Sequence, residues 1–284
     1  MKITLITACF NSAGTIGTAI ESVLSQKGVD VEYIVVDGGS KDGTVEIIKE
    51  YAEKTLNSQL LTPNFTFRWL SESDQGMYDA INKGIKMATG DVMGILNADD
   101  VLASDETLKR IAEAFESGGV ESGGVGERVD CGYADIRFVT RQDAASPCRG
   151  SLSCLRNAEA VRYCSAKSWR PWMFRFAAMV PHPSFYVRRE CFDRLGGYSL
   201  DYRICADFEL ELRYLYLAKL KAAYLPECVV VMRMGGMSTA GWRSNIVINR
   251  EDLRALRSHG IWSCLPLIYL KYLFKIWGFV FKRK

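Results

Sequence analysis

The chain has 284 residues, of which 48% are hydrophobic and 24% are charged, and its formal net charge at neutral pH is +3. This composition is typical of a globular protein of one large or two small domains, and it excludes a disordered chain. The net charge is too small to indicate a nucleic acid partner.

The cysteines and the N-terminus both favour a cytoplasmic protein. The nine cysteines form no Cys-x-x-Cys pair. Cys9, Cys191 and Cys264 stand in apolar runs, which favours reduced thiols over a disulfide framework or a zinc site. Because Met1-Lys2 leads directly into a strand-like segment, we expect no secretory signal.

The first hundred residues alternate strand and helix signals. Short apolar runs predict strands, and apolar positions at helical spacing, such as Ile16, Ile20 and Val23, predict helices. Strands are expected at 3–7, 32–36, 65–70 and 91–96, and helices at 13–26, 42–54, 78–88 and 104–115. This βαβαβαβ order predicts an α/β fold with a doubly wound, mostly parallel sheet.

Two adjacent carboxylates, Asp99 and Asp100, follow the strand expected at 91–96. They lie at the rim where open α/β sheets bind ligands. Their hard oxygens suit Mg²⁺ or Mn²⁺, and such an ion would suit a diphosphate. The same two residues are equally compatible with the N-cap of the helix expected at 104–115.

The turns after the first two strands argue against a dinucleotide-dependent oxidoreductase. The first turn, residues 8–14, has no Gly-x-Gly-x-x-Gly to bring the backbone against a pyrophosphate. The glycine-rich turn comes after the second strand instead, at 37–44. There Asp37, followed by two glycines, lets a flat base or ribose approach the backbone closely.

The C-terminal segment is basic and rich in aromatic residues. No acidic residue follows Asp252, and residues 261–281 are largely apolar. At about 100° per residue, Lys271, Lys275 and Lys282 share one side of a helix, as in a helix lying in the plane of a membrane. The alternative is a terminal helix that docks on the protein's own core.

Seven segments together resemble the successive motifs of family 2 glycosyltransferases. They are residues 7–11, 35–44, 71–84, 96–100, 181–186, 196–198 and 207–210. The resemblance covers about two-thirds of the chain. It implies a GT-A fold, with a mixed, mostly parallel sheet flanked by helices, and a hexosyltransferase of the type found in bacterial surface or exopolysaccharide biosynthesis.

The resemblance also implies roles for individual residues in binding a nucleotide-sugar donor. Ala8, Phe10, Asn11 and Asp37 would hold the nucleoside, Asp74 and Gly76 would line the donor pocket with Asn82 and Lys83 beside it, Asp99 would approach the ribose or sugar, and Asp100 would bind Mg²⁺ or Mn²⁺. The alternative for Asn82 and Lys83 is a solvated helix face. Gly38 stands in this donor site where many relatives have a second acid, which leaves the nucleotide open.

The general base implied by the resemblance is Asp207, which would deprotonate an acceptor hydroxyl for transfer with inversion. Partial burial can raise the pKa of a carboxylate toward a useful value. The alternative is again a helix N-cap. Glu209 ranks second as base, and His182 either belongs to the site or orients the backbone or the acceptor.

The remaining expectations concern the acceptor and the domains. We expect residues 1–115 to form the nucleotide-sugar-binding half, 116–245 the acceptor and base half, and 246–284 a helical, membrane-associating tail. A basic excess between 141 and 175, which includes Arg156 and Arg170, favours a glycan or lipid-diphosphate acceptor at the inner face of a membrane. A sugar-phosphate nucleotidyltransferase and a non-catalytic membrane scaffold are the alternatives.

Overall fold

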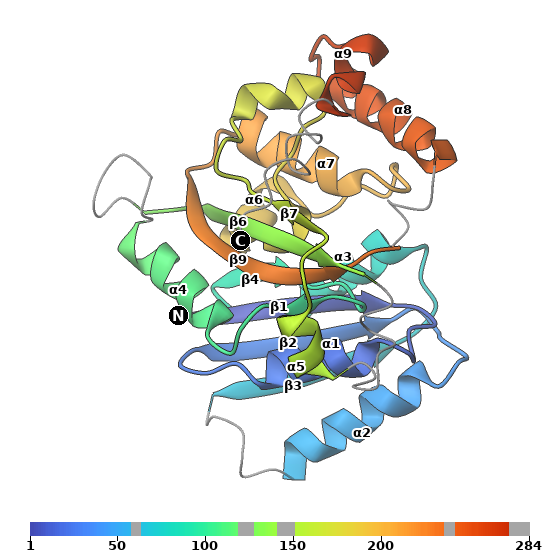
Figure 1. Cartoon of the computed structure of the whole chain (residues 1–284), viewed down its shortest axis with the longest axis vertical. Coiled ribbons are helices and arrows are strands. Elements are labelled where there is room, and N and C mark those ends of the chain that lie inside the picture. Colours follow the sequence, from blue (N-terminus) through green and yellow to red (C-terminus); the bar gives the residue numbers. More distant parts are fainter. Residues whose placement is uncertain (58–63, 119–127, 141–150, 236–241, 273–284) are drawn as a thin grey trace.

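The computed structural model describes residues 1–57, 64–118, 128–140, 151–235 and 242–272. A mixed sheet of nine strands runs through the centre of this described part (Figure 1). The strands are β1 (Lys2–Cys9), β2 (Asp30–Asp37), β3 (Phe65–Ser71), β4 (Val92–Ile95), β5 (Val101–Leu102), β6 (Cys131–Val139), β7 (Arg162–Cys164), β8 (Tyr186–Arg188) and β9 (Ala222–Arg233).

The strand order is β3-β2-β1-β4-β8-β6-β9-β5, with β7 paired to β6. β1 to β4 are all parallel, β8 is antiparallel to both β4 and β6, and β9 is parallel to β6. The predicted α/β class with a mostly parallel sheet is therefore confirmed. The strand order reverses between β1 and β4, and the carboxyl ends of the strands at such a reversal are where open α/β sheets bind ligands.

Helices cover both faces of the sheet. The helices are α1 (Ile16–Leu24), α2 (Thr44–Asn57), α3 (Met77–Met87), α4 (Thr107–Ser117), α5 (Leu152–Asn157), α6 (Arg189–Leu195), α7 (Ala206–Glu211), α8 (Trp242–Ser258) and α9 (Leu265–Tyr269). Short 3₁₀ segments are η2 (Pro171–Phe176) and η3 (His182–Ser184), and α7 continues into a π-helix, η4 (Leu212–Leu217).

The core is split by the sheet into two apolar clusters. In β2, Tyr33 and Val35 pack into one cluster with α1 and α4, whereas Ile34 and Val36 pack into the other with α3 and α7. This alternation follows from the period-two geometry of a strand. Because β2 is buried on both faces, its residues 33–36 are all apolar and gave a continuous apolar signal. The buried carboxylates on either side, Glu32 and Asp37, accept hydrogen bonds.

Two predicted boundaries differ from the structure for local reasons. α1 begins at Ile16 rather than at residue 13, because the Ser12 carbonyl accepts the amides of Thr15 and Ile16 in a turn. α4 begins at Thr107, and the two-residue strand β5 lies between it and Asp100. Asp99 and Asp100 are therefore not the N-cap of this helix.

The C-terminal segment docks on the protein as far as Tyr272, the last residue that the structure describes. Ile268 is fully buried, and the Lys271 ammonium lies 2.7 Å from the Asp252 carboxylate, with both side chains buried. As far as Tyr272 this agrees with the alternative of a terminal helix docked on the protein's own core, because the charge of Lys271 is paired inside the fold. The other two lysines of the predicted membrane helix, Lys275 and Lys282, lie outside the described residues.

Two further expectations concern the thiols and the membrane. The cysteines within the described residues are free; Cys9 and Cys191 are buried, whereas Cys264 is partly exposed. In the described part of the chain, no helix has the length and apolar character needed to cross a bilayer.

Substitution of Lys271 tests the buried ion pair. We predict that Lys271→Met lowers the free energy of unfolding by about 3–5 kcal/mol, because it leaves the Asp252 carboxylate buried without its cation. Urea denaturation measures the loss. The double variant Lys271→Met/Asp252→Leu should recover most of it, and an unchanged midpoint for the single variant would contradict the assignment.

Candidate functional site

The site begins where β1, β2 and β3 end side by side. Asp37, the last residue of β2, is fully buried. Its carboxylate accepts hydrogen bonds from the Ser71 hydroxyl at 2.7 Å, from the Gly39 and Ser40 amides at 3.0 Å each, and from the Ser40 hydroxyl. Burial alone would raise the pKa of Asp37, but these donors outweigh burial and lower it. Asp37 is therefore an anion that shapes the turn behind it.

The loops after β1 and β2 are fastened to each other. The backbone amide of Asn11 donates to the Ser40 hydroxyl at 2.7 Å, and the side-chain oxygen of Asn11 accepts the backbone amide of Lys41 at 3.0 Å. Asn11 has a positive φ of 50°, which asparagine tolerates better than most residues. Ala8 is partly buried under this loop, whereas the Phe10 ring beside it is 61% exposed. The predicted nucleoside residues thus form one loop layer, with an aromatic face open to solvent.

Gly38 lies directly against the Asp74 carboxylate. A Cβ at Gly38 would lie 2.4 Å from Asp74 Oδ2, so no side chain fits there without moving Asp74. Asp74 also accepts the Gly76 amide at 2.8 Å, and Gly76 has a φ of 118° that favours glycine. The predicted donor residues of the β2 and β3 loops are therefore in contact, and Asp74 occupies the space of the missing second acid.

The two carboxylates of the Asp99-Asp100 pair differ in their exposure to solvent. Asp99 is partly exposed, whereas Asp100 is buried, with its oxygens accepting the Asn97 side-chain amide at 2.8 Å and the Arg233 backbone amide at 3.4 Å. Burial first, and the charge of Asp99 second, raise the pKa of Asp100 well above its usual value. The pair is thus a concentration of negative charge that a cation would stabilise.

The donor chemistry of this pair fits a Mg²⁺ or Mn²⁺ ion. Two carboxylates are the usual protein share for Mg²⁺, which takes its other ligands from substrate phosphates and water. In the segments that the structure describes, no cluster of three or more His, Cys, Asp or Glu side chains is arranged to hold a metal. Asp99 and Asp100 therefore fit a metal ion whose remaining ligands come from a bound substrate and water, and not an ion that is coordinated by protein side chains alone.

Asp207 lies in the first turn of α7 and is held by α3. Its Oδ1 accepts the Tyr78 hydroxyl at 3.2 Å and the Phe208 amide at 2.8 Å, and the same hydroxyl donates to the Ile204 carbonyl. Burial raises the pKa of Asp207 to about 6, against the lowering effect of these two donors. The N-cap position of α7 is Cys205, so Asp207 is not a cap. It is a carboxylate whose affinity for protons suits a base near neutral pH.

Tyr198, in the loop at 196–198, contacts two residues of α3, Asn82 and Tyr78. The Asn82 side chain donates to the Tyr198 carbonyl at 2.8 Å and accepts the Tyr198 amide at 2.9 Å. Tyr198 stacks on Tyr78 with ring centroids 5.5 Å apart, and its hydroxyl lies 2.7 Å from His182 Nε2. Burial lowers the pKa of His182 to about 4, so this ring is neutral at pH 7. Asn82 and His182 therefore orient Tyr198 and, through it, Tyr78.

Lys83 does not lie on a solvated helix face either. Its ammonium contacts Glu72 at 2.8 Å and donates to the Ser73 carbonyl at 3.0 Å, and the hydrogen bond to Glu72 raises the pKa of Lys83. Lys83 thereby ties α3 to the loop that carries Asp74.

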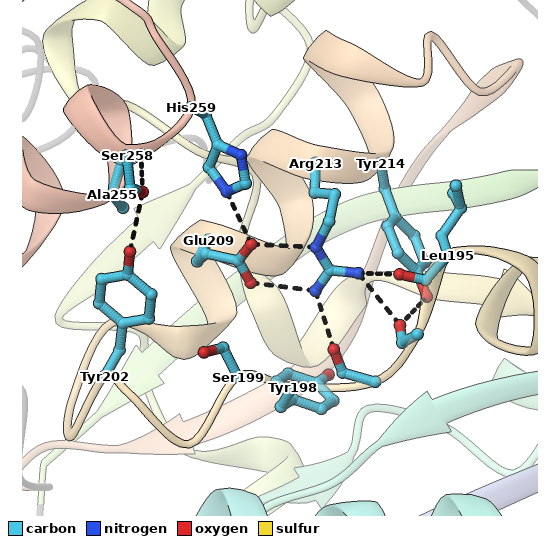
Figure 2. Close-up of polar contacts among 12 residues, drawn as sticks. Leu195, Tyr198, Ser199, Tyr202, Glu209, Arg213, Tyr214, Ala255, Ser258 and His259 are labelled. Atoms are coloured by element: carbon cyan, nitrogen blue, oxygen red, sulfur yellow. Dashed lines mark hydrogen bonds and ion pairs between the residues drawn. The ribbon is translucent and has the colours of Figure 1, made fainter.

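Glu209 is engaged in an ion-pair cluster. Figure 2 shows the Arg213 guanidinium between the Glu209 carboxylate and the carbonyl groups of the turn that begins at Leu195. Arg213 donates to both Glu209 oxygens at 3.0 Å, and His259 Nε2 lies 2.9 Å from one of them. Despite burial, these contacts lower the pKa of Glu209. Its carboxylate therefore ties α7 to α8 and to the 195–197 turn, which disfavours it as the base.

The basic residues expected to hold an acceptor diverge. The Arg156 guanidinium is committed to Asp105, to the Leu102 carbonyl and to the Ser25 hydroxyl. Arg170 donates to the neighbouring Trp169 carbonyl at 2.7 Å. Two further members of this predicted set, Arg141 and Arg149, lie outside the described residues. The guanidinium groups of Arg156 and Arg170 are thus both engaged with groups of the protein itself.

Three side chains at the site received no role from the sequence. Tyr78 and Tyr198 lie in two of the segments that resemble family motifs, at 71–84 and 196–198. The sequence alone does not indicate that these two side chains stack on each other. Arg233, at the end of β9, reaches Asp100 through its amide and donates a guanidinium hydrogen to Thr18 at 2.7 Å. Its charge also acts to lower the pKa of Asp100. The only signal for Arg233 was its place just before Gly235 and Gly236.

Comparison with known proteins identifies the family of the chain. Residues 4–144 match the family described as Glycosyl transferase family 2. The chain is 27% identical over 252 residues to a PGL/p-HBAD biosynthesis glycosyltransferase of Mycobacterium bovis, covering 89% of this chain and 82% of the relative.

Two solved structures resemble the whole fold. S. aureus TarS 1-349 in complex with UDP-GlcNAc matches with a TM-score of 0.60 at 17% identity, over 90% of this chain and 66% of that one. The mannosyltransferase PcManGT of Pyrobaculum calidifontis, in complex with GDP-Man and Mn²⁺, matches with a TM-score of 0.59 at 19% identity, over 98% and 72%. In another crystal structure of TarS, this chain covers 44% of the longer chain.

The fold and the sequence matches define a glycosyltransferase of the GT-A fold. The chain belongs to glycosyltransferase family 2. The resemblance found in the sequence motifs is confirmed, and an enzyme is favoured over a scaffold.

Loss of the Glu209 charge tests the ion-pair cluster. We predict that Glu209→Gln lowers the free energy of unfolding at pH 7 by about 2–3 kcal/mol, because Arg213 loses its charged partner. The folded pKa of Glu209 is lowered, so its contribution is present above its unfolded value of about 4.3 and is lost as the pH falls through the folded value. Urea denaturation at neutral and acidic pH measures both effects.

The matched control for this cluster is Glu227→Gln, which removes the partner of Arg110 at the surface. Both side chains of that pair are more than one-third exposed, so the change should leave the free energy of unfolding nearly unchanged. Equal losses for Glu209→Gln and Glu227→Gln would contradict the role assigned to Glu209.

Proposed function

We propose that the protein transfers a sugar, with inversion, from a nucleotide diphosphate donor to a hydroxyl group of a glycan or lipid-diphosphate-linked acceptor, with Asp207 as the general base. One observation carries this proposal: Asp207 is tied by Tyr78 to α3, the helix that starts from the Asp74–Gly76 loop. A carboxylate with a raised pKa thereby lies beside the expected donor pocket.

The proposed reaction needs one proton transfer and one displacement. Asp207 takes the proton from the acceptor hydroxyl, and the acceptor oxygen attacks the anomeric carbon on the face opposite the leaving group. The bond between that carbon and the phosphate oxygen breaks, and the nucleotide diphosphate leaves with the electron pair. Tyr78 and the Phe208 amide hold Asp207 Oδ1, which leaves Oδ2 as the oxygen to accept the proton.

Asp99 and Asp100 are the residues proposed to hold a Mg²⁺ or Mn²⁺ ion. When bound, such an ion supplies charge neutralisation for a departing diphosphate. Arg233 adds a positive charge of the protein itself next to Asp100. The complex of PcManGT with GDP-Man and Mn²⁺ supports this assignment by likeness of fold.

The donor is proposed to lie across the loops after β1, β2 and β3. Phe10, which is 61% exposed, offers its ring to a base. Asp74 is proposed to act from the position of the absent acid next to Gly38. The UDP-GlcNAc complex of TarS and the GDP-Man complex of PcManGT support a nucleotide-sugar donor without selecting its base.

The setting proposed for this reaction is polysaccharide biosynthesis at the cytoplasmic face of a membrane. Residues 1–115 would bind the donor, 116–245 would supply the base and the acceptor surface, and 246–284 would associate with the membrane. The apolar, acid-free sequence after Asp252 supports this division.

Ligand-induced stabilisation tests the donor and metal assignments. We predict that at least one nucleotide sugar raises the melting temperature in the presence of Mn²⁺ or Mg²⁺, because a ligand that binds only the folded chain stabilises it. Asp100→Ala should abolish the metal-dependent part. Stabilisation that survives this substitution unchanged would remove Asp100 from the metal site, and no stabilisation by any nucleotide sugar would contradict the donor class.

The pH dependence of transfer tests the base. Since Asp207 must be deprotonated, kcat/KM should fall as the pH drops below about 6. Tyr78→Phe removes a hydrogen bond that favours the carboxylate, so the pKa of Asp207 should rise and the acidic limb should move to higher pH. Asp207→Asn should lower kcat by at least about 10²-fold. An acidic limb that Tyr78→Phe leaves in place would show that Tyr78 does not position the base.

A further inference from the structure

Two exposed tryptophans, Trp172 and Trp262, line one pocket together with Leu267 of α9. Figure 1 shows α8 and α9 at one end of the molecule. The exposed fractions are 54% for Trp172 and 76% for Trp262. We call this surface the aromatic patch, and it consists of Trp172, Phe176 and Trp262 with Tyr216 and Leu267, which line one pocket together. Large exposed apolar patches mark interaction sites more often than isolated exposed residues do.

The aromatic patch is built from three segments that are distant in the sequence. Trp172 meets Phe176 edge-on within η2, with ring centroids 5.8 Å apart, and the Ser263 hydroxyl donates to the Arg175 carbonyl at 2.8 Å. This hydrogen bond joins the segment that carries Trp262 to η2. A pocket of about 500 Å³ opens between them and is lined by Trp172, Arg175, Phe176, Tyr216, Trp262 and Leu267.

The charge of these three segments has one sign. Residues 160–181, 212–226 and 253–284 contain no aspartate or glutamate. Exposed basic side chains flank the patch instead, at Arg170 and Arg175 around η2 and at Lys219 after η4. Aromatic rings together with basic side chains, without acids, are the composition found at membrane–water interfaces.

We propose that the aromatic patch docks the protein on an anionic lipid bilayer. The rings enter the interfacial layer, and the basic side chains face lipid phosphates. This inference deepens the proposed function and rests on it only for the lipid-linked acceptor, since docking itself requires no sugar transfer.

The bilayer fits the patch better than a second copy of the chain does. In a symmetric dimer the same surface occurs on both sides, so the acid-free, basic surface of one copy would face that of the other. The sequence beyond Tyr272, where the description ends, adds Trp277 and four more basic residues at 275 and 282–284. The chain thus continues from the patch with the same composition, which suits an extended anionic surface.

The patch is connected to the catalytic helix. Phe174 of η2 is buried and meets Phe208 edge-on, with ring centroids 5.6 Å apart. Phe208 directly follows the proposed base, Asp207. Docking through the patch would therefore hold α7 near the membrane surface, where a lipid-linked acceptor hydroxyl is presented.

Vesicle binding by the full chain tests this proposal. We predict that the wild-type protein co-sediments with phosphatidylcholine vesicles that contain phosphatidylglycerol, and that Trp172→Ala/Trp262→Ala lowers the partition coefficient on the order of tenfold. Leu56→Ala is the matched control, because Leu56 is 86% exposed on α2, at the opposite end of the molecule (Figure 1). The control should bind as the wild type does, and added salt should weaken binding.

Three results would overturn the proposal: no binding of the wild type to the anionic vesicles, equal binding of the double variant, or a wild-type dimer in solution that the double variant dissociates. Thermal unfolding of each variant excludes a folding defect, since both tryptophans are exposed. Asp207→Asn should keep full vesicle binding. Failure of the proposed transfer and failure of docking are therefore observed separately.

Discussion

The site depends on the contact of α3 with the segment that ends in α7. The Tyr78 hydroxyl reaches both the Ile204 carbonyl and Asp207, and the Asn82 side chain pairs with the backbone of Tyr198. These contacts span more than 110 residues of sequence and join the loops at the carboxyl ends of the parallel strands to the helix that carries the proposed base. Without them, Asp207 would have no fixed relation to the carboxyl ends of β1 and β4.

Three carboxylates of the site differ in their surroundings, and the difference suits different roles. Asp37 is surrounded by donors, so it stays an anion and organises a turn. Asp100 is buried beside another acid, which favours a cation. Asp207 has two donors on one oxygen and a pKa raised to about 6 by burial, which favours exchange of a proton. All three are at least partly buried, and Asp37 has the most hydrogen-bond donors. Asp100 and Asp207 have two donors each and differ in that Asp100 lies beside the charge of Asp99.

Local patterns predicted the strands and helices of the first hundred residues, because a strand buried on both faces and an amphipathic helix each leave a periodic signal. β5 left none, since it has two residues and exists only through pairing with β9, 130 residues further along the chain at the Val101–Val231 pair. For the same reason, the sequence did not indicate that Lys271 is buried in an ion pair. Its partner, Asp252, is 19 residues away, and helical periodicity does not report such a pairing.

The sequence motifs located Asp37, Asp74, Asp99, Asp100 and Asp207, but their contacts required the fold. Nothing in the sequence indicated that Asp74 fills the space beside Gly38, or that Glu209 is taken up by Arg213 and His259. The central claim is a single displacement assisted by Asp207. It is tested most directly by the anomeric configuration of the product, read from proton coupling constants in NMR with a donor of known configuration. A single displacement predicts a product with the inverted anomeric configuration. A product that retains the donor's configuration would contradict a single displacement.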